Sequence, residues 1–127
     1  MPVTGLDHVN IVTRDLAGTK RFYKDLLGLV DGDTSSLPAG IVAHWLADPA
    51  GRNIIHLQHF DPERHGSPGT ATGAIDHVAL DCTDYDGMVA RCTALGVEHR
   101  TGLAGASFRQ LFVTDPNNVL LELNFRG

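Results

Sequence analysis

The sequence has few of the features that mark several large classes of protein. Its two cysteines, Cys82 and Cys92, are too few and too far apart for a disulfide framework or a Cys-x-x-Cys site. We interpret both as small core residues of a protein in a reducing cytoplasm. No stretch approaches the roughly 18–20 apolar residues that a membrane span needs. The first residues also have neither the basic start nor the apolar core of a signal peptide.

Basic runs and abundant aromatic residues are absent as well. The formal net charge is −5 and aromatic residues make up 6% of the chain, which argues against a nucleic-acid partner. The hydrophobic fraction of 43% and the charged fraction of 20% are typical of a globular protein. A length of 127 residues fits one domain with a real core.

The two halves of the chain resemble each other. The segment "GLDHVNIVTRDLAG" (5–18) aligns with "AIDHVALDCTDYDG" (74–87) at an offset of 69 residues. Further on, "HWLADPAGRNIIHLQ" (44–58) aligns with "LFVTDPNNVLLELN" (111–124), and the offset falls to 66 at the end. The three extra residues of the first half are easily absorbed in loops. Ordered matches along both halves predict a duplicated structural module.

Each half has the same pattern of expected elements. An alternating strand is followed by a turn with Asp and Gly, a helix that a Leu-Gly pair ends, and two or three further strands. The last two strands meet at an Asp-Pro turn. The expected elements are strands at 8–13 and 77–82, helices at 16–27 and 85–95, and turns at 48–51 and 115–118. The sequence therefore predicts an α+β fold of two βαβββ modules, about 1–60 and 75–127, joined by a Gly- and Pro-rich linker at 61–74.

A glutamate interrupts the apolar strand "LLELNF" (120–125). Burying the unpaired carboxylate of Glu122 would cost several kcal/mol unless it is protonated, paired or bound to a cation. The repeat places His56 at the equivalent position of the first half, and it aligns His8 with His77. If the two modules curl toward each other, imidazole and carboxylate donors converge, as divalent first-row metals require. We therefore predict a metal site formed by His8, His56, His77 and Glu122.

Each of these residues also has an ordinary interpretation. A single strand histidine is commonly a core or surface side chain, and Glu122 could pair with Arg109 or point outward. The joint occurrence of four such residues at repeat-equivalent positions favours the metal. The remaining histidines, His44, His59, His65 and His99, lack a repeat partner of ligand type or face the other side of a strand, and we interpret them as surface or neighbouring residues.

Polar residues beside the predicted ligands are candidates for substrate binding. Asn10, Gln58 and Asn124 each lie two residues from a ligand on the same strand face, where they could hold substrate or water, or simply form a polar rim. Arg109 could contact an anionic group, as could Arg14 and Arg21, although surface arginines are common.

The motifs "LDHVNI", "FYKDLLGL", "DHVAL" and "QLFVTDPNNVLLELNF" resemble the vicinal oxygen chelate superfamily. This superfamily includes glyoxalase I, methylmalonyl-CoA epimerase, fosfomycin-resistance thiol transferases, bleomycin-binding proteins and extradiol dioxygenases. The resemblance implies the glyoxalase/bleomycin resistance/dioxygenase fold, with paired βαβββ modules forming a curled mixed sheet. It also implies a homodimer and a metal held at the positions of His8, His56, His77 and Glu122.

Departures from individual families leave the reaction open. Bacterial glyoxalase I has a carboxylate at the position of His56, an arginine at that of Val12 and an asparagine at that of Phe60. The epimerase has a glutamine at the position of His56. Extradiol dioxygenases place two histidines and a glutamate like His8, His77 and Glu122, a triad typical of non-haem Fe(II), but they usually have four modules. Bleomycin binders lack the ligands altogether.

The ligand charge supplies a further indication. Three neutral imidazoles and one carboxylate would leave a divalent ion with a net charge of about +1, which suits an anionic substrate bound through two adjacent oxygens. The sequence-based expectation is an Fe(II) or Mn(II) dioxygenase, with His56 and Glu122 as catalytic residues. The alternatives are a lyase or isomerase that uses Ni, Co, Zn or Mn, and a non-catalytic small-molecule binding protein.

Overall fold

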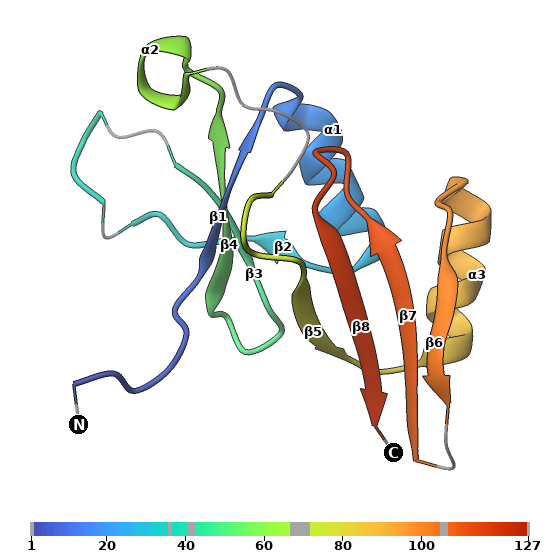
Figure 1. The fold of residues 1–127 in the computed structure, drawn as a ribbon. Coiled ribbons are helices and arrows are strands. Elements are labelled where there is room, and N and C mark those ends of the chain that lie inside the picture. Colours follow the sequence, from blue (N-terminus) through green and yellow to red (C-terminus); the bar gives the residue numbers. More distant parts are fainter. Residues whose placement is uncertain (1, 36, 41–42, 67–71, 105–106, 127) are drawn as a thin grey trace. The chain divides into compact units, whose positions relative to one another are not determined.

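The computed structural model describes residues 2–35, 37–40, 43–66, 72–104 and 107–126 (Figure 1). Contacts along the chain divide it into two compact units, Met1–His65 and Gly66–Gly127. The boundary falls inside the predicted linker 61–74, of which residues 67–71 lie outside the described ranges.

The first unit contains a four-stranded sheet in the order β1-β4-β3-β2. The β1 and β4 strands run parallel, and the other neighbours are antiparallel. A short helix, α2, follows the sheet. The elements are β1 (Val9–Thr13), α1 (Leu16–Arg21), the π-helical η1 (Phe22–Leu26), β2 (Val30–Asp31), β3 (His44–Ala47), β4 (Asn53–His59) and α2 (Pro62–His65).

The second unit repeats this topology. Its sheet has the order β5-β8-β7-β6, with β5 and β8 parallel and the other neighbours antiparallel. The elements are β5 (Val78–Cys82), α3 (Tyr85–Leu95), β6 (Arg100–Ala104), β7 (Phe108–Thr114) and β8 (Leu120–Arg126). The predicted two βαβββ modules are therefore confirmed. The first predicted helix differs in one respect, because it continues beyond Arg21 as a π-helix.

The repeated Asp and Gly residues begin both main helices. The side chain of Asp15 accepts a hydrogen bond from Gly18 N at 2.9 Å, and that of Asp84 accepts one from Gly87 N at 3.1 Å. Each carboxylate thus satisfies a backbone donor that the first helical turn leaves free. A Cβ at either glycine would lie 2.2 or 2.1 Å from the capping carboxylate, so a larger residue there would push the carboxylate out of its capping position.

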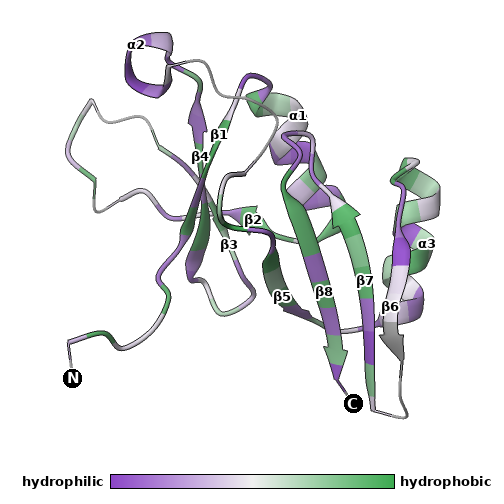
Figure 2. Cartoon of the chain, viewed as in Figure 1, coloured by the Kyte–Doolittle hydropathy of each residue, from purple (hydrophilic) through white to green (hydrophobic). Residues whose placement is uncertain are grey.

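The apolar core of each unit lies on one face of its sheet. Along β4, Ile55 and Leu57 are buried, and along β8 Leu121, Leu123 and Phe125 are buried. Helices cover these faces, since Thr13 of β1 bonds Thr19 of α1, and the Tyr85 ring of α3 meets Phe125 at 5.3 Å. Figure 2 shows the resulting alternation of hydrophobic and hydrophilic residues along β8. Strand periodicity therefore turns the even-numbered residues of β4 and β8, His56 and Glu122 among them, to the face opposite the helices.

No helix in the described parts of the chain is long and apolar enough to cross a membrane.

Candidate metal centre

In the first unit, His8 and His56 lie close together. His8 directly precedes β1, and His56 in β4 is paired in register with Asn10 of β1. The centroids of the two imidazole rings are 6.0 Å apart. The parallel pairing of the first and last strands thus brings together two predicted ligands that are 48 residues apart in the sequence.

Trp45 contacts both of these histidines. It lies on β3 opposite His56, with the two rings nearly parallel at 18° and their centroids 4.4 Å apart. Its edge-to-face contact with His8 has a centroid distance of 4.7 Å. The indole therefore restricts the orientation of both imidazoles. Sequence reasoning missed Trp45, although the repeat places an aromatic residue, Phe112, at the same position opposite Glu122.

Burial lowers the pKa of His56, and electrostatic interactions with His8, His44 and Arg64 lower it further. The imidazole is therefore neutral at neutral pH, and a neutral imidazole is the form that binds metals and accepts protons.

A cavity of about 420 Å³ adjoins His56 in the first unit. No acidic residue lines it in the described part of the chain, and Arg64 contributes a permanent positive charge. The residues around it are Leu37, Ala43, His44, Trp45, His56, Leu57, Gln58, His59 and Arg64. An anionic or flat group could enter beside Trp45.

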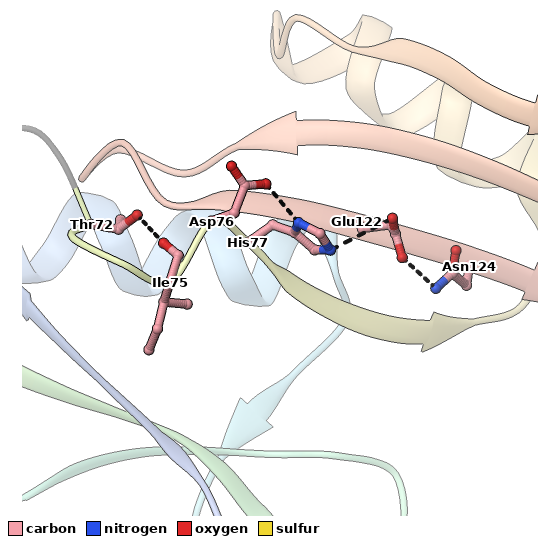
Figure 3. A network of polar contacts seen from close by, with 6 residues as sticks. All are labelled: Thr72, Ile75, Asp76, His77, Glu122 and Asn124. Carbon is pink, nitrogen blue, oxygen red and sulfur yellow. Dashed lines mark hydrogen bonds and ion pairs between the residues drawn. The ribbon is translucent and has the colours of Figure 1, made fainter.

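The second unit holds the other two predicted ligands (Figure 3). His77 precedes β5, and its Nε2 lies 3.7 Å from Glu122 Oε1 on β8. The second carboxylate oxygen of Glu122 accepts a hydrogen bond from Asn124 Nδ2 at 3.0 Å. Asn124 Oδ1 in turn accepts one from Gln110 Nε2 at 3.1 Å. The Glu122 side chain is 18% exposed, so its surroundings rather than bulk water hold its orientation.

A hydrogen bond from the imidazole to Asp76 raises the pKa of His77, and the charge of Glu122 raises it further. The His77 Nδ1 lies 2.8 Å from Asp76 Oδ2. The first unit repeats this arrangement, since His8 Nδ1 lies 2.6 Å from Asp7 Oδ2.

The other predicted substrate-binding residues have different surroundings. Asn10 Nδ2 donates to Gln58 Oε1 at 3.0 Å on the His56 face of the first unit. Asn124 is 8% exposed and directs its amide to Glu122. Arg109 pairs in register with Phe125, so it faces the side of the sheet that α3 covers. Its guanidinium lies 4.0 Å from the Tyr85 ring centroid and 3.9 Å from Asp86. The structure thus does not bring Arg109 to Glu122 within their unit.

In the second unit, the donor atoms of His77 and Glu122 are close enough to bind one divalent ion. Two metal–ligand bonds of about 2.1 Å span at most about 4 Å, and the 3.7 Å between His77 Nε2 and Glu122 Oε1 lies within that range. The described residues include no group of three or more His, Cys, Asp or Glu side chains that could hold a metal. Each unit contains two of the four predicted ligands.

Comparison with known families identifies the chain. The profile of the Glyoxalase/Bleomycin resistance protein/Dioxygenase superfamily matches residues 5–123. The chain belongs to this superfamily. The match extends over both βαβββ units and confirms the resemblance inferred from the sequence motifs.

Solved structures of the superfamily fold are similar over nearly the whole chain. A glyoxalase/dioxygenase from Nostoc punctiforme matches with a TM-score of 0.73 and 19% identity, covering 97% of this chain and 91% of that one. A putative glyoxalase family protein from Bacillus anthracis has a TM-score of 0.71 and 17% identity, with coverages of 98% and 97%. The fosfomycin resistance protein FosX from Listeria monocytogenes has a TM-score of 0.68 and 20% identity, with coverages of 98% and 95%. No curated protein sequence matches the chain.

Proposed function

We propose that this protein is a metal-dependent enzyme that binds a small substrate through two adjacent oxygens. In the proposal, His8, His56, His77 and Glu122 hold one divalent cation, with two ligands from each unit. The two units would come from one chain or from two chains of a homodimer. The observation that supports it is the repeated pairing of a first-strand histidine with a last-strand donor in each unit.

The ligand set defines what the bound ion would contribute. With three neutral imidazoles and one carboxylate, the ion would stabilise negative charge on two substrate oxygens as a Lewis acid. Such charge develops in a bound catecholate, α-hydroxy acid or enediolate, and these are the substrate classes that we propose.

Other steps of the proposed reaction depend on protein side chains, which would transfer a proton, orient a ligand and attract the substrate. His56 is neutral at neutral pH and borders the cavity that Trp45 and Arg64 help to form. It is therefore suited to take a proton from a substrate in that cavity. Asn124 holds the Glu122 carboxylate in one orientation. Arg64 would attract an anionic group of the substrate.

Among the possible reactions, we propose dioxygenation of a catechol-like substrate first. If His56 leaves the ion, His8, His77 and Glu122 would form a two-histidine, one-carboxylate triad for Fe(II) or Mn(II), and the released His56 imidazole would serve for proton transfer. The similar structure from Nostoc punctiforme carries the description glyoxalase/dioxygenase, in line with this proposal.

A glyoxalase-like lyase or isomerase using Ni, Co, Zn or Mn is the second candidate. It is favoured by the neutral His56 imidazole, because proton shuttling between adjacent carbons needs a base of this kind. A protein that binds a small molecule without catalysis is the third candidate.

Metal analysis of protein purified without an affinity tag tests the proposal. We expect about one divalent ion per site, which a His77→Ala variant loses and a His99→Ala control retains, since His99 is exposed and its imidazole bonds the Val97 carbonyl rather than a predicted ligand. Iron together with oxygen uptake on catechols would support the dioxygenase. Nickel or zinc with activity on hemithioacetals would support the lyase. Absence of metal, with unchanged ligand binding in His77→Ala, would leave only the binding protein.

A further inference from the structure

Both first-strand histidines are held in the same way by the residue that precedes them. His8 Nδ1 lies 2.6 Å from Asp7 Oδ2, and His77 Nδ1 lies 2.8 Å from Asp76 Oδ2. All four residues precede the first residue of their strand, Val9 or Val78, so the two pairs occupy repeat-equivalent places. His56 and Glu122, the candidate ligands on the last strands, are oriented by other contacts. Trp45 orients His56, and Asn124 orients Glu122.

Neither contact has the properties of a stabilising ion pair. The aspartate side chains are 90% and 83% exposed, and exposed pairs of this kind contribute little to folding. Their effect is local instead. An ionised carboxylate can only accept a hydrogen bond, so the proton of the neutral ring must lie on Nδ1 and the lone pair on Nε2. In the second unit, Nε2 is also the atom that approaches Glu122, as Figure 3 shows.

The backbone before His77 is held as well. The Thr72 hydroxyl donates a hydrogen bond to the carbonyl of Ile75, the residue before Asp76 (Figure 3). This bond restricts the backbone next to Asp76 and so helps to keep the Asp76 carboxylate near the His77 imidazole.

We propose that Asp7 and Asp76 are positioning residues that make Nε2 the metal-binding atom of His8 and His77. This inference rests on the proposed metal site. A carboxylate that accepts the remote N–H of a ligating histidine fixes the tautomer, limits ring rotation and makes the bound nitrogen more basic. Two repeat-related pairs thus prepare one donor in each unit before the metal arrives.

The first test uses the metal-free protein. Long-range proton–nitrogen NMR of the neutral imidazoles reports which ring nitrogen carries the proton. We expect the Nδ1–H form for His8 and His77 in the parent protein. Asp7→Ala and Asp76→Ala should each shift their own histidine toward the Nε2–H form that an unconstrained imidazole favours. Unchanged tautomers in both variants would overturn the inference.

The second test measures affinity for Zn²⁺ by competition with a chelator. We expect Asp7→Ala and Asp76→Ala to bind about 10- to 100-fold more weakly, and the Asn variants to lose less because an amide oxygen still accepts the hydrogen bond. Asp86→Ala is the matched control. Its carboxylate is also exposed and forms an ion pair, but with Arg109 rather than with a predicted ligand. Unaltered affinity in both Ala variants would overturn the inference.

The two measurements separate this inference from the proposed function. If the parent protein fails to bind metal, the proposed function is overturned. The part of the inference that assigns Nε2 as the metal-binding atom is then overturned as well. The tautomer measurement would then still show whether the aspartates orient the rings. A parent protein that binds metal, with variants that bind equally well, would overturn the inference alone.

Discussion

Replacing Glu122 by Gln tests the chemical reason for a carboxylate in an apolar strand. The amide has the same shape and can still accept the hydrogen bond from Asn124, now made at 3.0 Å to the carboxylate. It lacks the negative charge with which the carboxylate attracts a divalent ion. We therefore expect the metal-free variant to fold with a free energy of unfolding within about 1 kcal/mol of the parent. Metal binding, in contrast, should weaken strongly.

The magnitude follows from ligand linkage. A ligand at one hundred times its dissociation constant stabilises the folded state by about 2.7 kcal/mol. For a chain of 127 residues, this raises the melting temperature by about 10 °C. Loss of a neighbouring group already weakens metal sites by about 10- to 100-fold, so loss of a direct ligand should reach at least about 100-fold. At the same metal concentration, stabilisation then falls to about 0.4 kcal/mol and the shift to about 1.5 °C.

The assay is thermal unfolding with and without the metal found in the parent protein. Glu98→Gln is the control, because Glu98 is an exposed acidic residue of the same unit. It should retain the full metal-induced shift. A Glu122→Gln variant that also retains the full shift would refute the role of Glu122 as a ligand.

Four further outcomes are expected. Asn124→Leu removes hydrogen bonds to Glu122 and Gln110 and should lower metal affinity about 10- to 100-fold in chelator competition. Asp84→Ala removes the cap of α3 and should lower the free energy of unfolding by about 1 kcal/mol in urea titration, whereas Asp84→Asn should cost less. The lowered pKa of His56 favours its neutral form in the folded state, so this contribution to stability is present above pH of about 6.5 and is lost as the pH falls. The raised pKa of His77 has the opposite sign, so its contribution is present below pH of about 6.5 and is lost as the pH rises. Unfolding of His56→Asn and His77→Asn between about pH 5 and 8 should therefore differ from the parent with opposite slopes. Burial raises the pKa of Cys82 to about 11, so iodoacetamide at about pH 8 should label it at least about 100-fold more slowly than glutathione, as measured by peptide mass spectrometry.

Each of these outcomes can be contradicted directly. Unchanged metal affinity in Asn124→Leu would mean that Asn124 does not need to orient Glu122 for metal binding. Unchanged stability in Asp84→Ala would mean that the Asp84 cap does not stabilise α3. Parallel pH slopes for the two histidine variants would contradict the assigned pKa directions. Labelling of Cys82 at the rate of glutathione would contradict its burial.

Much of the fold could be predicted because short segments encode it. An Asp that caps a helix and a Gly three residues later act within one turn, so their repetition at Asp15 and Asp84 marks both helix starts. The Asp-Pro turns likewise depend on local bonds, since Asp48 and Asp115 each accept a hydrogen bond from a backbone amide inside their own turn. The period of two residues along a strand then predicts which side chains share a face.

Other contacts around the candidate site depend on the tertiary structure. Trp45 contacts His56 because the register of β3 and β4 places them opposite each other. The register of β7 and β8 pairs Arg109 with Phe125, so Arg109 faces α3 and points away from Glu122. Asn124, a candidate for substrate binding, donates a hydrogen bond to Glu122. The sequence by itself thus determined the duplicated module and the four candidate ligands, because caps, turns and strand alternation act over a few residues. Only the folded sheets decided the cross-strand contacts, such as that of Trp45 with His56, because these neighbours come from distant parts of the chain.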